Sequence, residues 1–295
     1  MSERNKTLIG LHTAVLLAGA TGLFGRFISL AELPMVWYRV IISGIVLTCV
    51  MAAMGRLHAV SRKSLIKIAG CGMLLAIHWV AFFASIKHSN VSVGVVCIAT
   101  SCFFTTILDP IINRKRFSPI DMLISFITIA GILLIFSLDI RYRVGILLGL
   151  LSAAVYSVFS LLNVNVARET GEDSSTMLLY EFLGGIGILT LSMPAYAAMN
   201  PAAPLVPQAS DLIALLILGS IFTVVPFLLQ IHALRKLSAF TVNVCYNLEP
   251  VYSIIFAAII FGETRELSLP FWSGLALVVI SVVLQTLRSR KISAN

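Results

Sequence analysis

Apolar residues in this chain gather in long continuous runs, and short polar stretches separate each run from the next. Each run is close to the length of about 20 residues that a helix needs to cross a bilayer. The runs are continuously apolar rather than alternating, unlike the strands of a membrane barrel. Because a helix satisfies its own backbone hydrogen bonds in lipid, the pattern predicts an all-α integral membrane protein with ten transmembrane helices. The expected spans are residues 8–30, 34–54, 65–86, 91–112, 119–138, 144–167, 174–197, 212–232, 240–261 and 270–287.

The composition agrees with this pattern, since 59% of the 295 residues are hydrophobic and only 12% are charged. A soluble domain is about 45–50% apolar and about 25% charged. The chain is therefore neither a water-soluble enzyme nor a disordered segment. All five cysteines lie inside apolar runs, so no disulfide framework is indicated. A signal peptide ending near Ala20 is the less favoured interpretation of the N-terminus, because the apolar run continues past that residue.

The positive charges indicate how the spans are oriented. The net charge is +8, but the Lys and Arg residues lie in short clusters between runs, which argues against a nucleic-acid partner. Fifteen fall on one alternating set of loops: Arg4, Lys6, Arg56, Arg62, Lys63, Lys67, Arg114, Lys115, Arg116, Arg168, Arg235, Lys236, Arg288, Arg290 and Lys291. Four fall on the other set: Lys87, Arg141, Arg143 and Arg265. Positive residues favour the cytoplasmic side, so we predict a multi-pass protein of the cell membrane with both termini cytoplasmic.

The second half of the chain repeats the first. Ala84-Ser85-Ile86-Lys87 aligns with Ala233-Leu234-Arg235-Lys236 at an offset of 149 residues. The predicted repeats are residues 1–143 and 144–295, each with five spans. Because five is odd, the repeats have opposite orientations in the membrane, which is the inverted-repeat layout of many secondary transporters.

Several further motifs resemble a known family. They are His232-Ala233-Leu234-Arg235-Lys236-Leu237-Ser238-Ala239, Asn247-Leu248-Glu249-Pro250, Phe261-Gly262-Glu263, and in the first half Pro34…Arg39 and Ala84–Ser89. Together they are similar to the EamA-type bacterial members of the drug/metabolite transporter superfamily. The resemblance implies a transporter of amino acids or related amphipathic metabolites, and it leaves the individual substrate open.

Glu249 is the strongest candidate for a residue that takes part in transport. It lies near the middle of the ninth span, where a charge costs roughly 2.5–3.5 kcal/mol unless it has a partner or a wet cavity. Pro250 removes a backbone donor and favours a kink there. Transporters place binding sites at such interruptions. The alternative is a protonated acid that only holds helices together.

Other polar and aromatic residues are expected near the same depth. Asn243, Tyr246 and Asn247 share the ninth span with Glu249, and either line a cavity or hydrogen-bond between helices. Thr100 is the repeat counterpart of Glu249. A packing role is the alternative for His78 and Phe104. The candidate substrate-binding residues outside the ninth span are His78, Trp79, Phe82, Thr100, Phe104, Tyr156 and Gln230.

Arg39 and Glu181 occupy matching positions in the two halves. Each lies about 8 Å inside its span, at 1.5 Å per residue. Inverted topology puts them near opposite faces, so we expect separate roles as gates or helix-end anchors. Snorkelling to the interface is the alternative for Arg39 and the favoured interpretation for Arg26, which is closer to the end of its span.

The sequence therefore predicts a secondary transporter that exports small metabolites through a central cavity opening alternately to each side. A gradient would supply the energy, and proton or ion coupling is left open. No GxxxxGK[ST], HExxH or GxSxG motif occurs, so we expect no ATP hydrolysis, catalytic residue, metal or cofactor. A sensor or scaffold that keeps the fold without transport is the alternative function.

Overall fold

The computed structural model describes residues 3–114, 116–136, 142–237, 242, 245–246, 248–263 and 269–293, and all regular elements in these residues are helical. They are α1 (Glu3–Ala20), η1 (Thr21–Leu23), α2 (Phe24–Phe27), α3 (Glu32–Ala53), α4 (Arg62–Lys87), α5 (Val91–Ala99), α6 (Ser101–Asn113), α7 (Pro119–Phe136), α8 (Arg143–Thr170), α9 (Ser174–Met199), α10 (Ala209–Gly219), η3 (Ser220–Val224), α11 (Val225–Lys236), α13 (Glu249–Phe261) and α14 (Leu269–Ser293).

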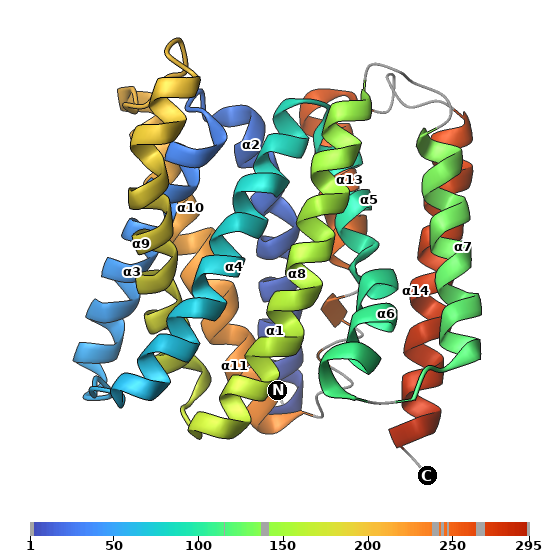
Figure 1. Cartoon of the computed structure of the whole chain (residues 1–295), viewed down its shortest axis with the longest axis horizontal. Coiled ribbons are helices and arrows are strands. Elements are labelled where there is room, and N and C mark those ends of the chain that lie inside the picture. The colour runs from blue at the N-terminus through green and yellow to red at the C-terminus, as the bar shows by residue number, and fades with distance from the viewer. Residues whose placement is uncertain are drawn as a thin grey trace.

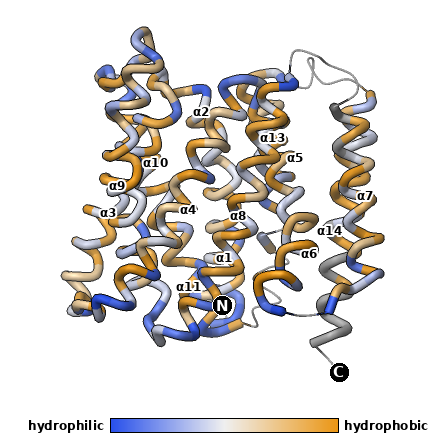
Figure 2. The backbone as a smooth tube through the Cα atoms, in the orientation of Figure 1, coloured by the Kyte–Doolittle hydropathy of each residue, from blue (hydrophilic) through white to orange (hydrophobic). Residues whose placement is uncertain are grey.

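Many of these helices are long and apolar enough to cross a membrane. Seven helical stretches in the described residues meet that criterion: 3–27, α3, α4, 91–113, α8, α9 and 209–236. Three shorter apolar helices accompany them, at Pro119–Gly131, Glu249–Phe261 and Leu269–Ser281. Figure 2 shows apolar residues along the lengths of the helices and hydrophilic ones mainly at their ends. The all-helical, membrane-type fold expected from the sequence is therefore present.

The helices stand roughly side by side, with α4 in contact with both α8 and α9 (Figure 1). Helix α3 packs on α9 and α10, and helix α1 packs on α11 and α13. The pair α7 and α14 lies at the opposite edge of the bundle (Figure 1). Helix α1 begins and helix α14 ends at the same end of the bundle (Figure 1). We call this end the terminal face and the opposite end the distal face.

Three spans that we expected to be continuous helices are interrupted. The first has a 3₁₀ turn at Thr21–Leu23, the fourth changes helix at Thr100, and the eighth contains the π-helical turn η3. Hydroxyl side chains bond to backbone carbonyls at these places. Thr21 Oγ1 donates to Phe222 O at 3.3 Å, and Thr223 Oγ1 donates to Leu218 O at 2.7 Å. Such bonds compete with the regular helical pattern, which hydropathy does not register.

Glycines allow α4 to approach its neighbours closely. A Cβ atom added to Gly72 of α4 would lie 1.9 Å from the carbonyl oxygen of Glu181, and one on Gly184 of α9 would lie 2.1 Å from that of Ala69. A Cβ atom added to Gly149 of α8 would lie 2.5 Å from the Cβ atom of Cys97. Small residues at helix interfaces let backbones pack in this way in membranes.

Gly184→Ala is expected to destabilise the protein, because its methyl group has no room against the α4 backbone. Overpacking of this kind costs typically about 1–3 kcal/mol. Gly187→Ala is the matched control on the same helix, since no atom lies within 4 Å of a Cβ added there. Thermal unfolding of the purified protein, followed by intrinsic fluorescence, measures the difference. Equal melting temperatures for the two variants would contradict the close packing of α4 and α9.

Candidate functional site

Two helix interruptions occur at corresponding places in the two halves of the chain. Between α5 and α6, the N–H of Thr100 donates to Cys97 O at 3.0 Å. Just before α13, the N–H of Leu248 donates to Cys245 O at 3.0 Å. Both bonds span three residues rather than four, which tightens the turn. Pro250 has no N–H, so the helix begins anew at Glu249.

The interruptions and the predicted histidine lie at similar depths. Thr100 is nine residues from the distal end of α5, and His78 is nine residues from the distal end of α4, which is about 14 Å at 1.5 Å per residue. Glu249 is twelve residues from the distal end of α13, or about 18 Å. A hydrocarbon core is about 30 Å thick. These residues therefore form a layer near the middle of the bundle, which we call the central layer.

Glu249 is the acidic group of the central layer. Its side chain is half-buried, and among the described residues no hydrogen bond or ion pair engages its carboxyl group. The phenol groups of Tyr156 on α8 and Tyr246 lie within electrostatic range of it. Tyr156 keeps 36% of its surface accessible.

His78 is buried and tied to α8. Its Nδ1 atom lies 3.1 Å from the carbonyl oxygen of Ser152, and Ser152 Oγ donates to the carbonyl of His78 at 2.9 Å. An Nδ1–H that donates to a carbonyl leaves Nε2 as the acceptor atom of a neutral imidazole. The ring lies 4.9 Å from Tyr156 and 6.4 Å from Phe82 between centroids. The structure therefore joins three of the predicted residues, His78, Tyr156 and Phe82, in one cluster.

Arg39 enters the same region from α3. Its guanidinium carbon lies 4.1 Å from the ring centroid of Trp79 and 5.6 Å from that of Phe83. Its Nε atom donates to Thr223 Oγ1 at 3.0 Å. The side chain is buried, and it contacts α4 and η3 rather than reaching for the distal interface. Arg39 therefore does not snorkel to the interface.

Glu181 lies nearer the terminal face, on α9. Its carboxylate accepts a hydrogen bond from Asn163 Nδ2 of α8. Because Trp37 Nε1 of α3 donates to Thr190 Oγ1 of α9, Arg39 lies close to the level of residue 188. Glu181 is then seven residues away along α9, about 10 Å. Arg39 and Glu181 thus have separate surroundings, and the gate or anchor roles expected for them stay predictions.

The remaining predicted residues are Thr100 of the central layer, Phe104, Gln230, Asn243 and Asn247. Thr100 is buried, and its hydroxyl donates to Cys97 O at 2.6 Å. Phe104 is half-buried on α6 beside Phe103, and Gln230 is half-buried on α11. Asn243 and Asn247 lie outside the described residues. Within the described part of the chain, no three His, Cys, Asp or Glu residues are placed to hold a metal ion.

The sequence profile of the EamA-like transporter family matches residues 5–137 and again residues 143–287. The chain belongs to the EamA-like transporter family. It is a multi-pass membrane protein, and the family marks it as a transporter.

Two further likenesses accompany the family match. A curated relative from Clostridium kluyveri, named "Uncharacterized transporter", is 20% identical over 233 residues, which cover 76% of this chain and 73% of the relative. A solved structure described as "Crystal structure of protein" has a TM-score of 0.62 at 18% identity, and the match covers 98% of this chain and 99% of that one. The second likeness shows that the two chains share a fold.

Sequence reasoning about this EamA-like transporter missed the role of Glu263. The left-handed Gly262 (φ 67°) ends α13, and Glu263 follows it fully buried. Its carboxylate accepts the N–H groups of Val91 and Ser92 at 3.0 and 2.9 Å and so caps the N-terminus of α5. The motif Phe261-Gly262-Glu263 was visible in the sequence, but nothing in it points to a helix 171 residues away.

Arg26, for which snorkelling to the interface is the favoured interpretation, also has partners within the bundle. Its Nη1 atom lies 3.3 Å from Glu263 Oε1, and its guanidinium carbon lies 4.7 Å from the ring centroid of Phe261. The charge of Arg26 therefore compensates the buried carboxylate. This contact joins α2 to the distal ends of α5 and α13.

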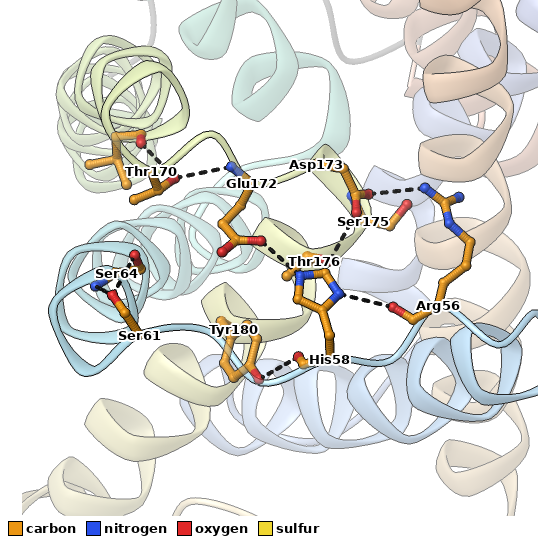
Figure 3. A network of polar contacts seen from close by, with 11 residues as sticks. Arg56, His58, Ser61, Ser64, Thr170, Glu172, Asp173, Ser175, Thr176 and Tyr180 are labelled. Carbon is orange, nitrogen blue, oxygen red and sulfur yellow. Dashed lines mark hydrogen bonds and ion pairs between the residues drawn. The ribbon is translucent and has the colours of Figure 1, made fainter.

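A polar network joins two segments at the terminal face (Figure 3). His58 Nε2, between α3 and α4, lies 2.8 Å from Glu172 Oε2, between α8 and α9. Tyr180 of α9 donates its hydroxyl to His58 O at 3.0 Å, and Arg56 pairs with Asp173 at 3.4 Å. The network connects α3 and α4 to α8 and α9 at the ends of these helices.

The charges of this network shift two pKa values. The hydrogen bond with Glu172 raises the pKa of His58, and the bond with the Arg56 carbonyl acts in the same direction. Partial burial raises the pKa of Asp173, but hydrogen bonds from Ser175 and Thr176 and the charge of Arg56 hold it below its usual value. Both shifts favour the charged forms.

Stability is expected to depend on the charge of His58. Because its pKa is raised in the folded protein, the stabilisation is fully present below the ordinary value of about 6.5 and is lost as pH rises through the raised pKa. His58→Gln should therefore lower the melting temperature at pH 6 and change it less at pH 9. His88→Gln at the distal face is the control. A His58→Gln effect of the same size at both pH values would contradict a contribution from the charged pair.

Proposed function

We propose that this protein is a secondary transporter that exports small metabolites, amino acids or related amphipathic compounds, by alternating access. The compound would bind between two inverted five-helix repeats, residues 1–143 and 144–295. The observation that carries the proposal is Glu249: a half-buried carboxyl group at a helix interruption in the middle of the bundle, with no partner among the described residues. A binding residue needs such an unoccupied polar group, whereas a structural acid is expected to have a partner.

The side chains of the central layer support a binding site for amphipathic compounds. His78, Tyr156 and Tyr246 supply polar atoms, while Trp79 and Phe82 supply aromatic faces. We further propose that Thr100, Phe104, Gln230, Asn243 and Asn247 line the pathway in one or both conformations. Glu249 carries a carboxyl group that can take up and release a proton, so proton coupling is the form of energy supply that we propose.

The arrangement of the helices supports two repeats in opposite orientation. The family profile matches the chain twice, at residues 5–137 and 143–287. The seven long helical stretches and the three shorter apolar helices of the described residues support the proposal of ten spans. Helix α1 begins at the terminal face and helix α14 ends there, as an even number of spans requires (Figure 1). With fifteen of the basic residues on that side, we propose that the terminal face is cytoplasmic and that the protein lies in the cell membrane.

A topology measurement tests the ten spans. A green fluorescent protein fused after Asn295 should fluoresce, and alkaline phosphatase fused there should be inactive, because both report on the compartment of the C-terminus. Alkaline phosphatase inserted after Pro204, between α9 and α10, should be active. The opposite pattern at either position would refute the inverted arrangement and the pathway with it.

Glu249→Gln is expected to slow transport at least roughly tenfold and to abolish its pH dependence, since the amide cannot ionise. Counterflow of a radiolabelled amino-acid mixture into proteoliposomes at pH 6 and pH 8 measures both quantities. Glu249→Asp should retain part of the pH dependence. Glu169→Gln, at the terminal end of α8, removes the same charge away from the central layer and should leave both quantities unchanged. If Glu249→Gln leaves rate and pH dependence unaltered, Glu249 has no part in transport.

A further inference from the structure

Arg39 has an unsatisfied hydrogen-bond donor in the interior of the bundle. Only 4% of the residue is accessible, and its Nη1 atom has no hydrogen-bond partner among the described residues. Its Nε atom is held by Thr223, and the flat face of the guanidinium lies over Trp79. A buried donor without a partner destabilises the folded protein. Packing alone therefore does not explain why an arginine occupies this position.

Two buried carboxylates of the bundle have partners within the protein. Glu263 is neutralised by Arg26 and accepts two backbone N–H groups of α5. Glu181 accepts a hydrogen bond from Asn163. In the described part of the chain, no carboxylate lies within ion-pair distance of Arg39, and its one hydrogen-bond partner, Thr223, is neutral. Among the described residues, no acidic side chain provides a counter-charge for Arg39.

The surroundings of Arg39 fix its orientation. Thr223 Oγ1 accepts from Arg39 Nε and donates to Leu218 O at 2.7 Å within the π-helical turn η3. This hydroxyl holds the Nε edge of the guanidinium and leaves the Nη1 atom free. Trp79 follows His78 directly in α4, and Arg39 lies within electrostatic range of His78. The free donor therefore lies beside the central layer.

A guanidinium in such a place is suited to bind an oxyanion. Its planar N–H donors match the two oxygens of a carboxylate, and charge-assisted bonds of this kind are the strongest hydrogen bonds in proteins. One carboxylate carries one negative charge, which balances the single positive charge of Arg39. The rings of Trp79 and Phe83 beside it favour an apolar or aromatic body attached to that carboxylate.

We propose that Arg39 binds the carboxylate of the transported compound, so that the protein accepts organic monoanions and zwitterions and rejects compounds whose only charge is positive. This inference rests on the proposed transport function and narrows its substrate class. It also gives the gate expected at Arg39 a physical basis, because a bound carboxylate would supply the partner that its Nη1 atom lacks.

Three probes with the same aromatic body test the proposal on the purified full-length protein. They are 3-phenylpropionate, 3-phenylpropanol and 3-phenylpropylamine, which carry a carboxylate, a hydroxyl and an ammonium group. Ligands that bind the folded state raise its melting temperature. We expect 3-phenylpropionate at saturation to raise it by about 3 °C or more, and the other two to raise it less. Equal shifts for the three probes, or no shift with any, would overturn the proposal without recourse to a variant.

Variants of Arg39 locate the effect. Arg39→Gln should abolish the shift with 3-phenylpropionate, and Arg39→Lys should weaken binding roughly 10- to 100-fold, because a lysine lacks the planar pair of donors. Arg143→Gln removes the same charge from an exposed position at the distal face and should bind as the wild type does. A shift that survives in Arg39→Gln would overturn the proposal.

A stability measurement distinguishes binding from a structural role. Arg39→Met keeps much of the apolar volume and removes the unpaired charge, so its melting temperature without ligand should equal or exceed that of the wild type. A large fall in both Arg39→Met and Arg39→Lys would show that the arginine holds the helices together, and would overturn a binding role.

Transport of the same probes in proteoliposomes separates this inference from the proposed function. Movement of 3-phenylpropanol or 3-phenylpropylamine at a rate that Arg39→Gln does not alter would support transport and overturn the carboxylate site. Binding of 3-phenylpropionate that depends on Arg39, with no protein-dependent movement of any of the three probes or of amino acids, would support the site and overturn transport.

Discussion

The structure depends on one constraint: polar groups in the interior of a membrane protein must find partners within the protein, because lipid offers none. At the distal end of α5, Glu263 meets this constraint by accepting two backbone N–H groups while Arg26 balances its charge. Glu181 meets it through Asn163. These contacts join segments that are far apart in sequence, so satisfying the buried groups also fixes how the helices are arranged.

The same constraint explains where the helices are interrupted. An interruption frees backbone groups, and side-chain hydroxyls replace some of the missing bonds, as Thr223 does within η3 and Thr100 does between α5 and α6. At Pro250 the chain removes a donor outright. Backbone and side-chain polar groups thus become concentrated at mid-depth, between apolar helix surfaces. A transporter needs polar atoms in that layer, and interruptions provide them without a polar helix.

Hydropathy predicted where the helices lie because a span needs about 20 apolar residues whatever its neighbours are. The offset of 149 residues also paired Thr100 with Glu249, and both lie at interruptions. Contacts between distant segments were not predictable in this way. Glu263 lies just past a span, and its partners in α5 come some 170 residues earlier. The sequence also could not show that Ser152 would form a hydrogen bond with His78. Serine is common in apolar runs, and nothing in the sequence around it identifies its partner.

The two proposed repeats differ in the polar residues at their matching positions, which bears on how one transported compound could pass through. Glu249 and Pro250 have Thr100 and Ser101 as counterparts, and Arg39 has Glu181. In a pathway whose halves were chemically identical, a charged group would meet the same environment from either side. Here the cation at Arg39 keeps a donor without a partner among the described residues, whereas the carboxylate at Glu181 accepts a hydrogen bond from Asn163. An anionic group would therefore be held more strongly on the distal side of the central layer than on the terminal side. Glu249 lies at a depth between those of Arg39 and Glu181. Its protonation would remove a negative charge from the pathway that such a compound follows.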